Sequence, residues 1–501
     1  MIKLIYRIES DYMSKKRMLI VTSVTLSVVT ISLGIVKLYQ TYALSNYIGT
    51  VTDTGIDVYI NDDSYASIPA NGSSNVYYML TNTNPGTVKY GVAYQTTSGV
   101  TVKVYDTSED PATGTIEEND KKYIKLHLEN KNSTNKTIEL STVLGYENGG
   151  DLVVPSGVTL VTDTYTPPPT AAEYITKLYT TASKTTVTNN SITYNTAPSV
   201  SLMNDRLGGT TTDLDGGNIR YYGASPNNYI YFNCSDYSNQ TSSTCETWRI
   251  IGVFDGKLKL IRGSQIGKYS WDNKNTSTGA EDNYGKNDWT TARLMKLLNP
   301  RDYYKVDSND NNLGQSLYYN SASGKCYSGQ NNATVDCDFT STGIKNDETR
   351  NMIAETTYYL GGWNSYSVYP NEIYEYERGT TVYTGRPPTW PGKIALAYPS
   401  DYGYAADLNQ CKDKTLCYYD NSTCTSNNWM KAILGTSSHG WLLTPYSGHS
   451  YYAWHVHSGG NVYSYLAYGA YGAVPVLSLS SELGIESGGD GSSSNPYKLS
   501  A

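Results

Sequence analysis

The sequence predicts a mostly β protein of the α+β class, with an N-terminal membrane helix followed by two β-rich domains. Three observations support this: an uncharged run near the N-terminus, short segments of alternating apolar and polar residues, and cysteines at short spacings. The 501 residues suffice for two or three domains. The net charge of −8 and the lack of a basic stripe indicate that nucleic acid is not a partner.

Residues 1–44 are predicted to form a cytoplasmic tail and a membrane anchor or signal segment. The run Met18–Val36 carries no charge, and as a helix it would rise about 28 Å, roughly one hydrocarbon core. The basic triplet at 15–17 precedes it and favours a cytoplasmic N-terminus. Thr41 and Ala43 also allow cleavage as a long signal peptide. Under both alternatives the rest of the chain is exported, and we expect a cell-envelope protein with its C-terminal bulk extracellular.

Cysteine spacing agrees with export. Local cysteine pairs in an exported protein are typical of disulfides that close short loops. The predicted bonds join Cys234 to Cys245, Cys326 to Cys337, and Cys411 to Cys424, which leaves Cys417 unpaired.

Residues 45–164 are predicted to be an all-β spacer domain. In "KYIKLHLEN", Ile124, Leu126 and Leu128 alternate with Tyr123, Lys125, His127 and Glu129. "NVYYMLTNTNPGTVKYGVAYQ" contains a strand, a turn at Asn84-Pro85-Gly86 and a second strand. Short strands at this spacing indicate an immunoglobulin-like β-sandwich without a catalytic set.

Residues 165–200 are predicted to be a Pro/Thr-rich linker with one short helix. Three successive prolines at 167–169 favour a stiff connector. Thr170 and Glu173 form a capping box for the helix "AAEYITKLY". We expect residues 183–200 to be irregular.

The C-terminal domain is predicted to begin near Ser201. Asp255-Gly256 lies between two apolar runs in "CETWRIIGVFDGKLKLIRG" and indicates a hairpin, with Trp248 in the core. "NDWTTARLMKLLNP" predicts a helix over 288–298 that Asn287 or Asp288 caps. Its buried face is predicted to consist of Trp289, Ala292, Met295 and Leu298. "GKIALAYPSDYGYA" predicts a buried strand and a turn.

The order of "WRIIGVFDGKLKLI", "NDWTTARLMKLLN", "YPSDYGYA", "GWLLTP" and "GAVPVLSL" resembles a family of uncharacterised surface domains of Gram-positive bacteria. These domains are similar to the formylglycine-generating-enzyme branch of the C-type lectin fold. The resemblance covers residues 201–485 and implies a C-type-lectin-like ligand-binding domain. The Gly/Ser-rich tail at 486–501 resembles tails of exported Gram-positive proteins. The family usually has Arg before the Pro of its last strand, where this chain has Val474-Pro475.

The same branch of the fold includes the hypervariable proteins of diversity-generating retroelements. The resemblance implies variable residues near the C-terminus, produced by mutation of template adenines in AAC-type codons. Such codons yield Tyr, Ser, His, Gly, Ala and Asn but never Lys, Glu, Gln, Met or Trp. The window Tyr446–Tyr471 obeys this rule except at Trp454, which would have to be framework.

This window is the candidate ligand-binding site. It contains no Lys, Arg, Asp or Glu, and tyrosine with small residues is the composition of antigen-binding loops. A hairpin is expected around Ser458–Asn461. The predicted contacts are Tyr446, His449, Tyr451, Tyr452, Trp454, His455, His457, Tyr463, Tyr465, Tyr468 and Tyr471. The expected partner is a protein or carbohydrate ligand on another cell or phage surface. An inert envelope protein is the alternative.

We expect no cofactor, no metal and no catalysis. His455 and His457 share one strand face and His449 is near, but H-x-H alone is a weak metal signal. Asp213 and Asp215 in "TTTDLDGGN" indicate a turn rather than a calcium loop. The carboxylates of a surface glycan hydrolase, the enzyme alternative, would be Glu372, Glu375 and Glu377. With Glu375 and Glu377 on one strand face, a solvated acidic edge is expected instead.

Overall fold

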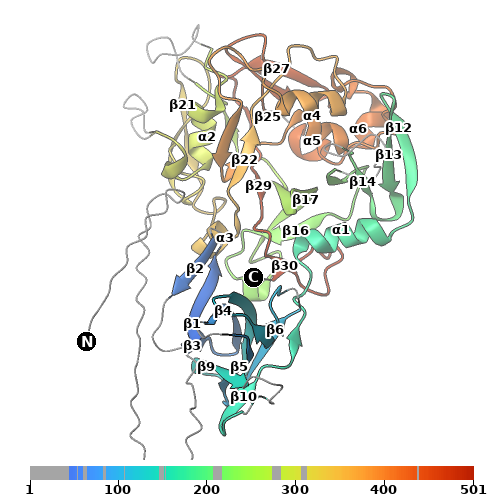
Figure 1. Ribbon diagram of the computed structural model, residues 1–501. Helices are drawn as coiled ribbons and strands as arrows, with labels where there is room; N and C mark the ends of the chain where they lie inside the picture. Colours follow the sequence, from blue (N-terminus) through green and yellow to red (C-terminus); the bar gives the residue numbers. More distant parts are fainter. Residues whose placement is uncertain are drawn as a thin grey trace, which may run out of the picture. The chain divides into compact units, whose positions relative to one another are not determined.

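The protein forms two compact units, one that ends at Tyr165 and one that begins at Thr166 (Figure 1). The computed structural model describes residues 44–52, 55–59, 65–82, 86–106, 108–145, 152, 154–206, 217–273, 284–305, 313–436 and 439–500. No helix within these ranges is both long enough and apolar enough to span a membrane. The anchor predicted at Met18–Val36 lies outside the described residues.

The first unit consists of two sheets. One has the order β11-β6-β8-β4-β1-β2, and the other has the order β10-β5-β9-β3 with β7 beside β5. The strands are β1 (Leu44–Thr52), β2 (Gly55–Tyr59), β3 (Tyr65–Ile68), β4 (Gly72–Asn82), β5 (Val88–Gln95), β6 (Val100–Tyr105), β7 (Thr113–Ile116), β8 (Lys121–Asn130), β9 (Lys136–Gly145), β10 (Val158–Leu160) and β11 (Thr164–Tyr165). The predicted all-β character is therefore confirmed.

The alternation along β8 is confirmed, with one exception on its polar side. Ile124, Leu126 and Leu128 are fully buried in a core that both sheets supply. His127 is also buried, because its ring stacks on Tyr165 at a centroid distance of 3.6 Å. A strand added in parallel at the sheet edge thus covers a residue that the local pattern assigns to solvent.

Of the predicted linker 165–200, Tyr165 belongs to the first unit and residues 166–200 belong to the second, where they form regular structure. Helix α1 (Ala171–Thr181) begins with the predicted capping box between Thr170 and Glu173. Residues predicted to be irregular form an antiparallel hairpin of β12 (Thr185–Asn189) and β13 (Ile192–Ala197). β13 pairs in turn with β14 (Leu202–Asn204), and β14 joins this local hairpin to a larger sheet.

That sheet has nine strands within the described residues, in the order β12-β13-β14-β15-β17-β18-β29-β24 with β16 beside β17. The further strands are β15 (Ile219–Tyr221), β16 (Tyr229–Phe232), β17 (Glu246–Phe254), β18 (Lys257–Arg262), β24 (Ile394–Ala395) and β29 (Val476–Ser478). The predicted β17–β18 hairpin is confirmed. Asp255 and Gly256 have φ values of 49° and 71°, as a two-residue turn of this kind requires.

A second sheet of this unit has the order β19-β28-β25-β26-β27. Its strands are β19 (Lys268–Tyr269), β25 (Gly440–Pro445), β26 (Tyr452–Val456), β27 (Val462–Leu466) and β28 (Tyr471–Gly472). Three two-stranded ribbons join β20 (Ser323–Tyr327) to β21 (Thr334–Asp338), β22 (Thr356–Tyr359) to β23 (Thr389–Gly392), and β30 (Gly484–Ile485) to β31 (Leu499–Ser500). The last ribbon and the buried Tyr497 show that residues 486–501, predicted to be a tail, belong to the domain.

Short helices cover these sheets. They are α2 (Arg293–Leu298), α3 (Asp347–Met352), α4 (Pro370–Arg378), α5 (Pro399–Tyr404), α6 (Ser422–Ser426) and α7 (Lys431–Leu434). α4 and α5 pack against each other (Figure 1). The predicted helix at 288–298 is present as a 3-10 turn followed by α2, and Asp288 provides the cap. Its predicted apolar face is buried, whereas the turn predicted in "YPSDYGYA" is helix α5.

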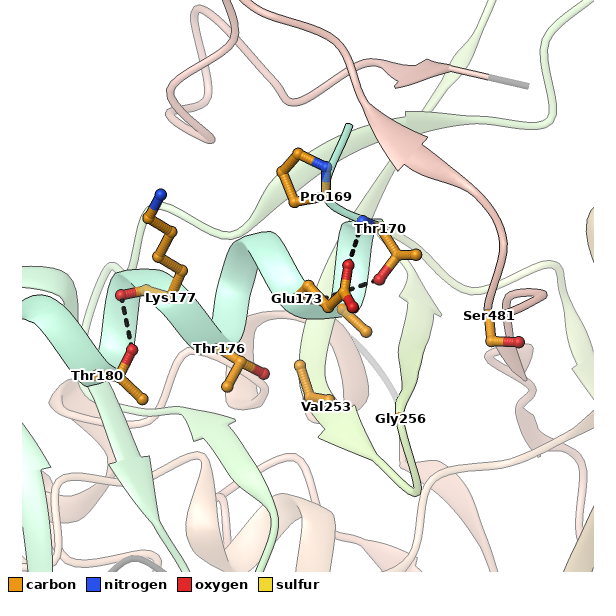
Figure 2. Close-up of a pocket in the computed structure, with 10 residues that line it drawn as sticks. Pro169, Thr170, Glu173, Thr176, Lys177, Thr180, Val253, Gly256 and Ser481 are labelled. Atoms are coloured by element: carbon orange, nitrogen blue, oxygen red, sulfur yellow. Dashed lines mark hydrogen bonds between the residues drawn. The ribbon is translucent and has the colours of Figure 1, made fainter. Parts of the chain in front are cut away.

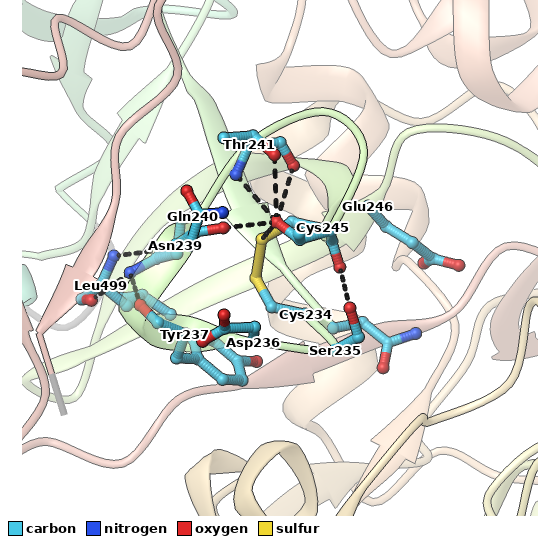
Figure 3. The surroundings of a disulfide bond; sticks show 12 residues. Cys234, Ser235, Asp236, Tyr237, Asn239, Gln240, Thr241, Cys245, Glu246 and Leu499 are labelled. Atoms are coloured by element: carbon cyan, nitrogen blue, oxygen red, sulfur yellow. Dashed lines mark hydrogen bonds between the residues drawn. A yellow bond between two sulfur atoms is a disulfide. The ribbon is translucent and has the colours of Figure 1, made fainter.

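The three predicted disulfides are confirmed, and Cys417 is free and buried. Figure 3 shows Cys234–Cys245 closing a short loop, in which the backbone N–H of Cys245 donates to the carbonyl of Thr241 at 2.9 Å. Such bonds form and persist in oxidising compartments. They therefore indicate an extracellular or secreted environment for the chain.

Trp248 is the first test of the core. Its side chain is fully buried, contacts Phe232 edge-on at 5.2 Å and donates to Glu246 at 3.0 Å. We expect Trp248→Ala to lower the free energy of unfolding by about 3–5 kcal/mol, because a large cavity remains. Trp248→Phe, the conservative control, should retain most of the stability. Urea denaturation measures the stability of both variants. An unchanged denaturation midpoint for Trp248→Ala would show that Trp248 is not packed in the core.

Candidate functional site

The candidate site lies on β26, β27 and the loops that flank them. The predicted hairpin around Ser458–Asn461 is confirmed, with His455 opposite Tyr463 and Ala453 opposite Tyr465. β27 lies at the end of its sheet. The hairpin therefore presents two of its tyrosines at a sheet edge.

Exposure divides the predicted contacts into three groups. Tyr463 and Tyr465 are 36% and 39% exposed, and His449 is also exposed. Half-buried positions are held by Tyr446, Tyr451, Tyr452, His457, Tyr468 and Tyr471. Trp454 is fully buried and His455 is 4% exposed, so neither is placed to contact a ligand directly. Trp454 belongs to the core beneath β26, and neighbouring rings cover His455.

The exposed and half-buried rings contact one another, and we name them the aromatic face. It consists of Tyr446, His449, Tyr451, Tyr452, Tyr463, Tyr465, Tyr468 and Tyr471, together with Tyr284 and Tyr366. The ring of His457 contacts that of His439 instead. Tyr465 lies 5.2 Å from Tyr471 between ring centroids, and Tyr451 lies 5.0 Å from Tyr452. The side chains of the aromatic face end in phenol or imidazole rings. The window Tyr446–Tyr471, which provides most of them, contains no Lys, Arg, Asp or Glu.

Two members of the aromatic face come from distant parts of the chain and were not predicted. Tyr284 contacts Tyr451 at 5.1 Å and Tyr468 at 6.1 Å. Tyr366 lies 5.2 Å from Tyr463, and its hydroxyl is 2.9 Å from that of Ser464. Neither tyrosine is distinguishable by local sequence in a chain with 50 tyrosines. Only the tertiary fold brings them to the hairpin.

Asn287 holds the loop that carries half of this face. Sequence suggested it as a helix cap, but it is buried and its amide nitrogen lies 3.1, 2.7 and 2.9 Å from the carbonyls of Tyr446, His449 and Tyr452. Its backbone N–H donates to Ser450 at 2.8 Å. Arg386 donates to the side-chain Oδ1 of Asn287 at 3.2 Å and to the backbone carbonyl of Ser450 at 3.1 Å. One amide therefore donates to three carbonyls of the loop, although those of Tyr446 and Tyr452 also accept the backbone N–H groups of His449, at 3.5 Å, and Tyr446, at 2.9 Å.

Three histidines meet beside the hairpin. The ring of His439 lies 5.2 Å from that of His455 and 4.4 Å from that of His457. Burial, followed by the nearby His439 and His457, lowers the pKa of His455 to about 3. Burial also lowers the pKa of His439, with smaller contributions from His457 and Lys268.

The described residues include no group of three or more His, Cys, Asp or Glu side chains arranged to hold a metal ion. His449 lies with Tyr446, Tyr451 and Tyr452 rather than with the other histidines. Asp213 and Asp215 lie outside the described residues. Within the H-x-H pair, His455 packs against Tyr465 and Tyr471, and His457 packs against His439.

The acidic candidates for an enzyme lie on helix α4, which corrects the predicted strand edge. Glu375 is exposed, whereas Glu377 is fully buried, because residues two apart on a helix point in different directions. Glu377 accepts hydrogen bonds from the backbone N–H of Ser400 at 2.9 Å and from its hydroxyl at 2.6 Å. Burial raises the pKa of Glu377 to about 7. These contacts join α4 to α5 and do not form a pair of carboxylates facing a substrate.

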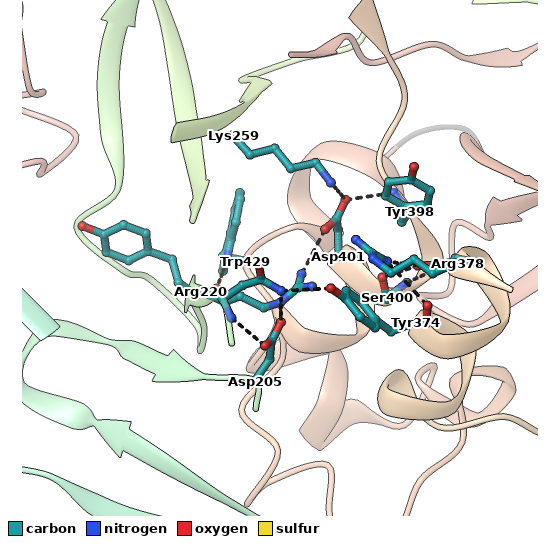
Figure 4. Close-up of polar contacts among 12 residues, drawn as sticks. Asp205, Arg220, Lys259, Tyr374, Arg378, Tyr398, Ser400, Asp401 and Trp429 are labelled. Carbon is teal, nitrogen blue, oxygen red and sulfur yellow. Dashed lines mark hydrogen bonds and ion pairs between the residues drawn. The ribbon is translucent and has the colours of Figure 1, made fainter. Parts of the chain in front are cut away.

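A buried ion cluster occupies the space between the nine-stranded sheet and α5 (Figure 4). Asp401 forms ion pairs with Arg220, at 3.0 Å, and with Lys259. Arg220 also pairs with Asp205, and all four side chains are almost completely buried. The two cations hold the pKa of Asp401 below its usual value although burial alone would raise it. This mutual compensation is what a structural cluster requires.

Two open cavities lie away from the aromatic face. One, of about 560 Å³, runs along α1 and is lined by Glu173, Lys177, Val253 and Ser481 among others (Figure 2). Glu173 is already engaged in the capping box there. The other, of about 500 Å³, lies in the first unit beside His127 and Tyr165. Neither cavity is lined by residues of the window Tyr446–Tyr471, and the aromatic face remains the candidate site.

No protein-family model matches the chain, and no curated protein matches it significantly. The functional argument therefore rests on the chain's own residues.

The role of Asn287 can be tested directly. We expect Asn287→Ala to lower the free energy of unfolding by about 1–3 kcal/mol, since three loop carbonyls lose a donor. Backbone amides at 447–452 should exchange hydrogen faster, as measured by mass spectrometry. Asn239→Ala, at an exposed asparagine, is the control and should leave both quantities unchanged. Unaltered exchange in the Asn287 variant would refute the anchoring role.

The ion cluster gives a second test. Asp401→Asn leaves Arg220 and Lys259 without their shared carboxylate, and we expect a loss of about 3–5 kcal/mol of stability. The pKa of Asp401 is lower in the folded protein than in the unfolded chain. The ionised carboxylate therefore stabilises the fold at a pH above the pKa of the unfolded chain, and this stabilisation is lost as the pH falls through the folded pKa. Urea denaturation of Asp401→Asn, compared with Asp420→Asn at an exposed position, measures the effect. Equal stability of the two variants would contradict the cluster's role.

Proposed function

We propose that the protein is a cell-surface recognition protein that binds a protein or carbohydrate ligand through the aromatic face. The observation that carries this is the gathering of tyrosines from β26, β27 and two distant segments at one edge of a sheet, with Tyr463 and Tyr465 exposed. Large aromatic side chains left partly in solvent contribute little to folding. They contribute strongly to recognition, because they provide stiff, amphipathic contact area.

The chemistry of the face suits an uncharged ligand surface. The window Tyr446–Tyr471 contains no formal charge, so binding would not require ions to lose their hydration. Phenol rings stack on apolar faces of sugars or proteins, and their hydroxyls provide hydrogen bonds at the rim. Asn287 keeps the loop backbone fixed and so reduces the entropy lost on binding.

We further propose that the second unit is a C-type-lectin-like domain and the first an immunoglobulin-like spacer, anchored by residues 1–44 in the membrane of a Gram-positive bacterium. The resemblance in its ordered motifs and the two-sheet core of the first unit support this. Diversification of the window by a retroelement is part of the proposal. Trp454, the residue in the window that adenine mutagenesis of AAC-type codons would not produce, is fully buried, as a framework position should be.

The double variant Tyr463→Ala/Tyr465→Ala tests the binding function. We expect at least about a tenfold loss of affinity, because interface tyrosines are frequent hot spots. The change in unfolding free energy should stay below about 1 kcal/mol, as both residues are exposed. Glycan arrays and binding to intact cells measure the affinity, with and without EDTA, and the chelator should have no effect.

The matched control is Tyr359→Ala. Tyr359 is 36% exposed on β22, outside the aromatic face, and its loss should leave binding intact. If the wild-type chain binds none of the glycans and no cell surface, or if the control weakens binding as much as the double variant, the proposed function is wrong. Loss of binding with EDTA would instead favour a metal-dependent site.

A further inference from the structure

The three clustered histidines lie at the junction of several strands that support the aromatic face. His439 precedes β25, His455 lies in β26, and His457 follows β26. Tyr471 of β28 lies 4.6 Å from His439 and 5.0 Å from His455 between ring centroids. The cluster therefore contacts the face from beneath.

Little around His439 and His455 can compensate a proton. Lys268 of β19 adds a positive charge near His439. The groups facing His455 from neighbouring strands are the phenols of Tyr465, at 6.4 Å, and Tyr471. Asp420, exposed beside the turn after β26, contributes to the pKa of neither His439 nor His455.

The hydrogen bonding of the ring nitrogens also disfavours protonation of the cluster. The Nδ1 atoms of both His439 and His455 are buried and have no hydrogen-bond partner among the residues that the structure describes. The Nδ1 atom of His457 accepts the backbone N–H of Gly459 at 3.1 Å, which fits a neutral ring. A proton added to Nδ1 of His455 would meet no acceptor and would lie beside two further imidazoles.

We propose that the His439–His455–His457 cluster makes the aromatic face acid-labile: when the cluster takes up a proton, β25, β26 and β28 separate and the tyrosines above them lose their arrangement. The consequence for ligand release rests on the proposed function, whereas the separation of the strands does not. The proposal adds a pH-dependent control to a surface that otherwise carries no titrating carboxylate in its window.

The direction of the pH dependence follows from proton linkage. In the closed form the pKa of His455 is lowered to about 3, whereas an opened, hydrated histidine has a pKa near 6.5. The closed form is therefore fully favoured above about pH 6.5, and it loses stability as the pH falls toward about 3. Within this window the ratio of open to closed molecules rises by up to roughly tenfold per pH unit for each proton taken up.

Hydrogen exchange on the ligand-free full chain tests the proposal. Exchange of the amides at 454–456 is measured between about pH 7 and pH 5 and corrected for the intrinsic pH dependence of exchange. The variants are His455→Phe, which keeps a flat ring but cannot titrate, and His449→Phe as the control. His449 belongs to the same window, is exposed, and lies outside the cluster.

We expect the corrected exchange to rise severalfold to tenfold per pH unit in the wild type and in His449→Phe, and to be independent of pH in His455→Phe. Constant protection in the wild type, or the same slope in His455→Phe, would overturn the proposal. If His455→Phe does not fold, proton NMR titration of the wild-type imidazoles decides. An imidazole of His455 that titrates near 6.5 without opening also overturns it.

The absence of ligand separates this test from that of the proposed function. A chain that opens with acid but binds nothing supports the acid-labile cluster and contradicts the recognition role. A chain that binds its ligand but keeps constant exchange supports recognition and contradicts the cluster's role.

Discussion

The carboxylate of Asp401 is the contact on which the architecture of the second unit depends. It lies in α5 and forms ion pairs with Arg220 of β15 and Lys259 of β18, so it fastens a helix to two strands of the large sheet. Buried charges are costly unless each is compensated. Here the fold cannot move α5 away from the sheet without taking the carboxylate from Lys259 and one of its two carboxylates from Arg220. Helix α5 in turn holds α4, because the hydroxyl of Ser400 in α5 donates to Glu377 of α4. This fixes the two helices beside β25.

A different principle holds the aromatic face. A buried amide, Asn287, gathers three backbone carbonyls, and Arg386 donates to that amide. Hydrogen bonds to the backbone do not depend on the identity of the side chains that the loop carries. A loop held in this way can therefore vary its exposed residues while keeping its path, which is the property that a recognition surface needs.

The composition of the face has consequences for its chemistry. Tyrosine and histidine carry polar atoms without a permanent charge, so they can be packed beside one another at a sheet edge at low electrostatic cost. The buried Trp454 and the exposed Tyr463 show how one hairpin serves the core with one residue and the solvent with another. The same packing makes the interior histidines sensitive to protonation, because their neighbours are aromatic rings and other imidazoles.

The sequence by itself determined the structures that neighbouring residues decide among themselves. The capping box of Thr170 and Glu173, the turn at Asp255-Gly256, the β26–β27 hairpin and disulfides that close loops of eleven to thirteen residues all depend on short-range contacts. A local pattern specifies such contacts because little chain entropy opposes them. Much of the candidate window was predictable for the same reason.

Only the tertiary structure decided what depends on distant partners. It paired β15 with β17 and so joined the local strands before it to the large sheet, and it placed Glu377 inside a helical interface. It also brought Tyr284, Tyr366 and Asn287 to the hairpin from distant parts of the chain. It also separated the buried Trp454 and His455 from the exposed tyrosines beside them. A period-two pattern marks the two sides of a strand, but which side meets solvent depends on the elements packed against it, and short-range sequence carries no record of them.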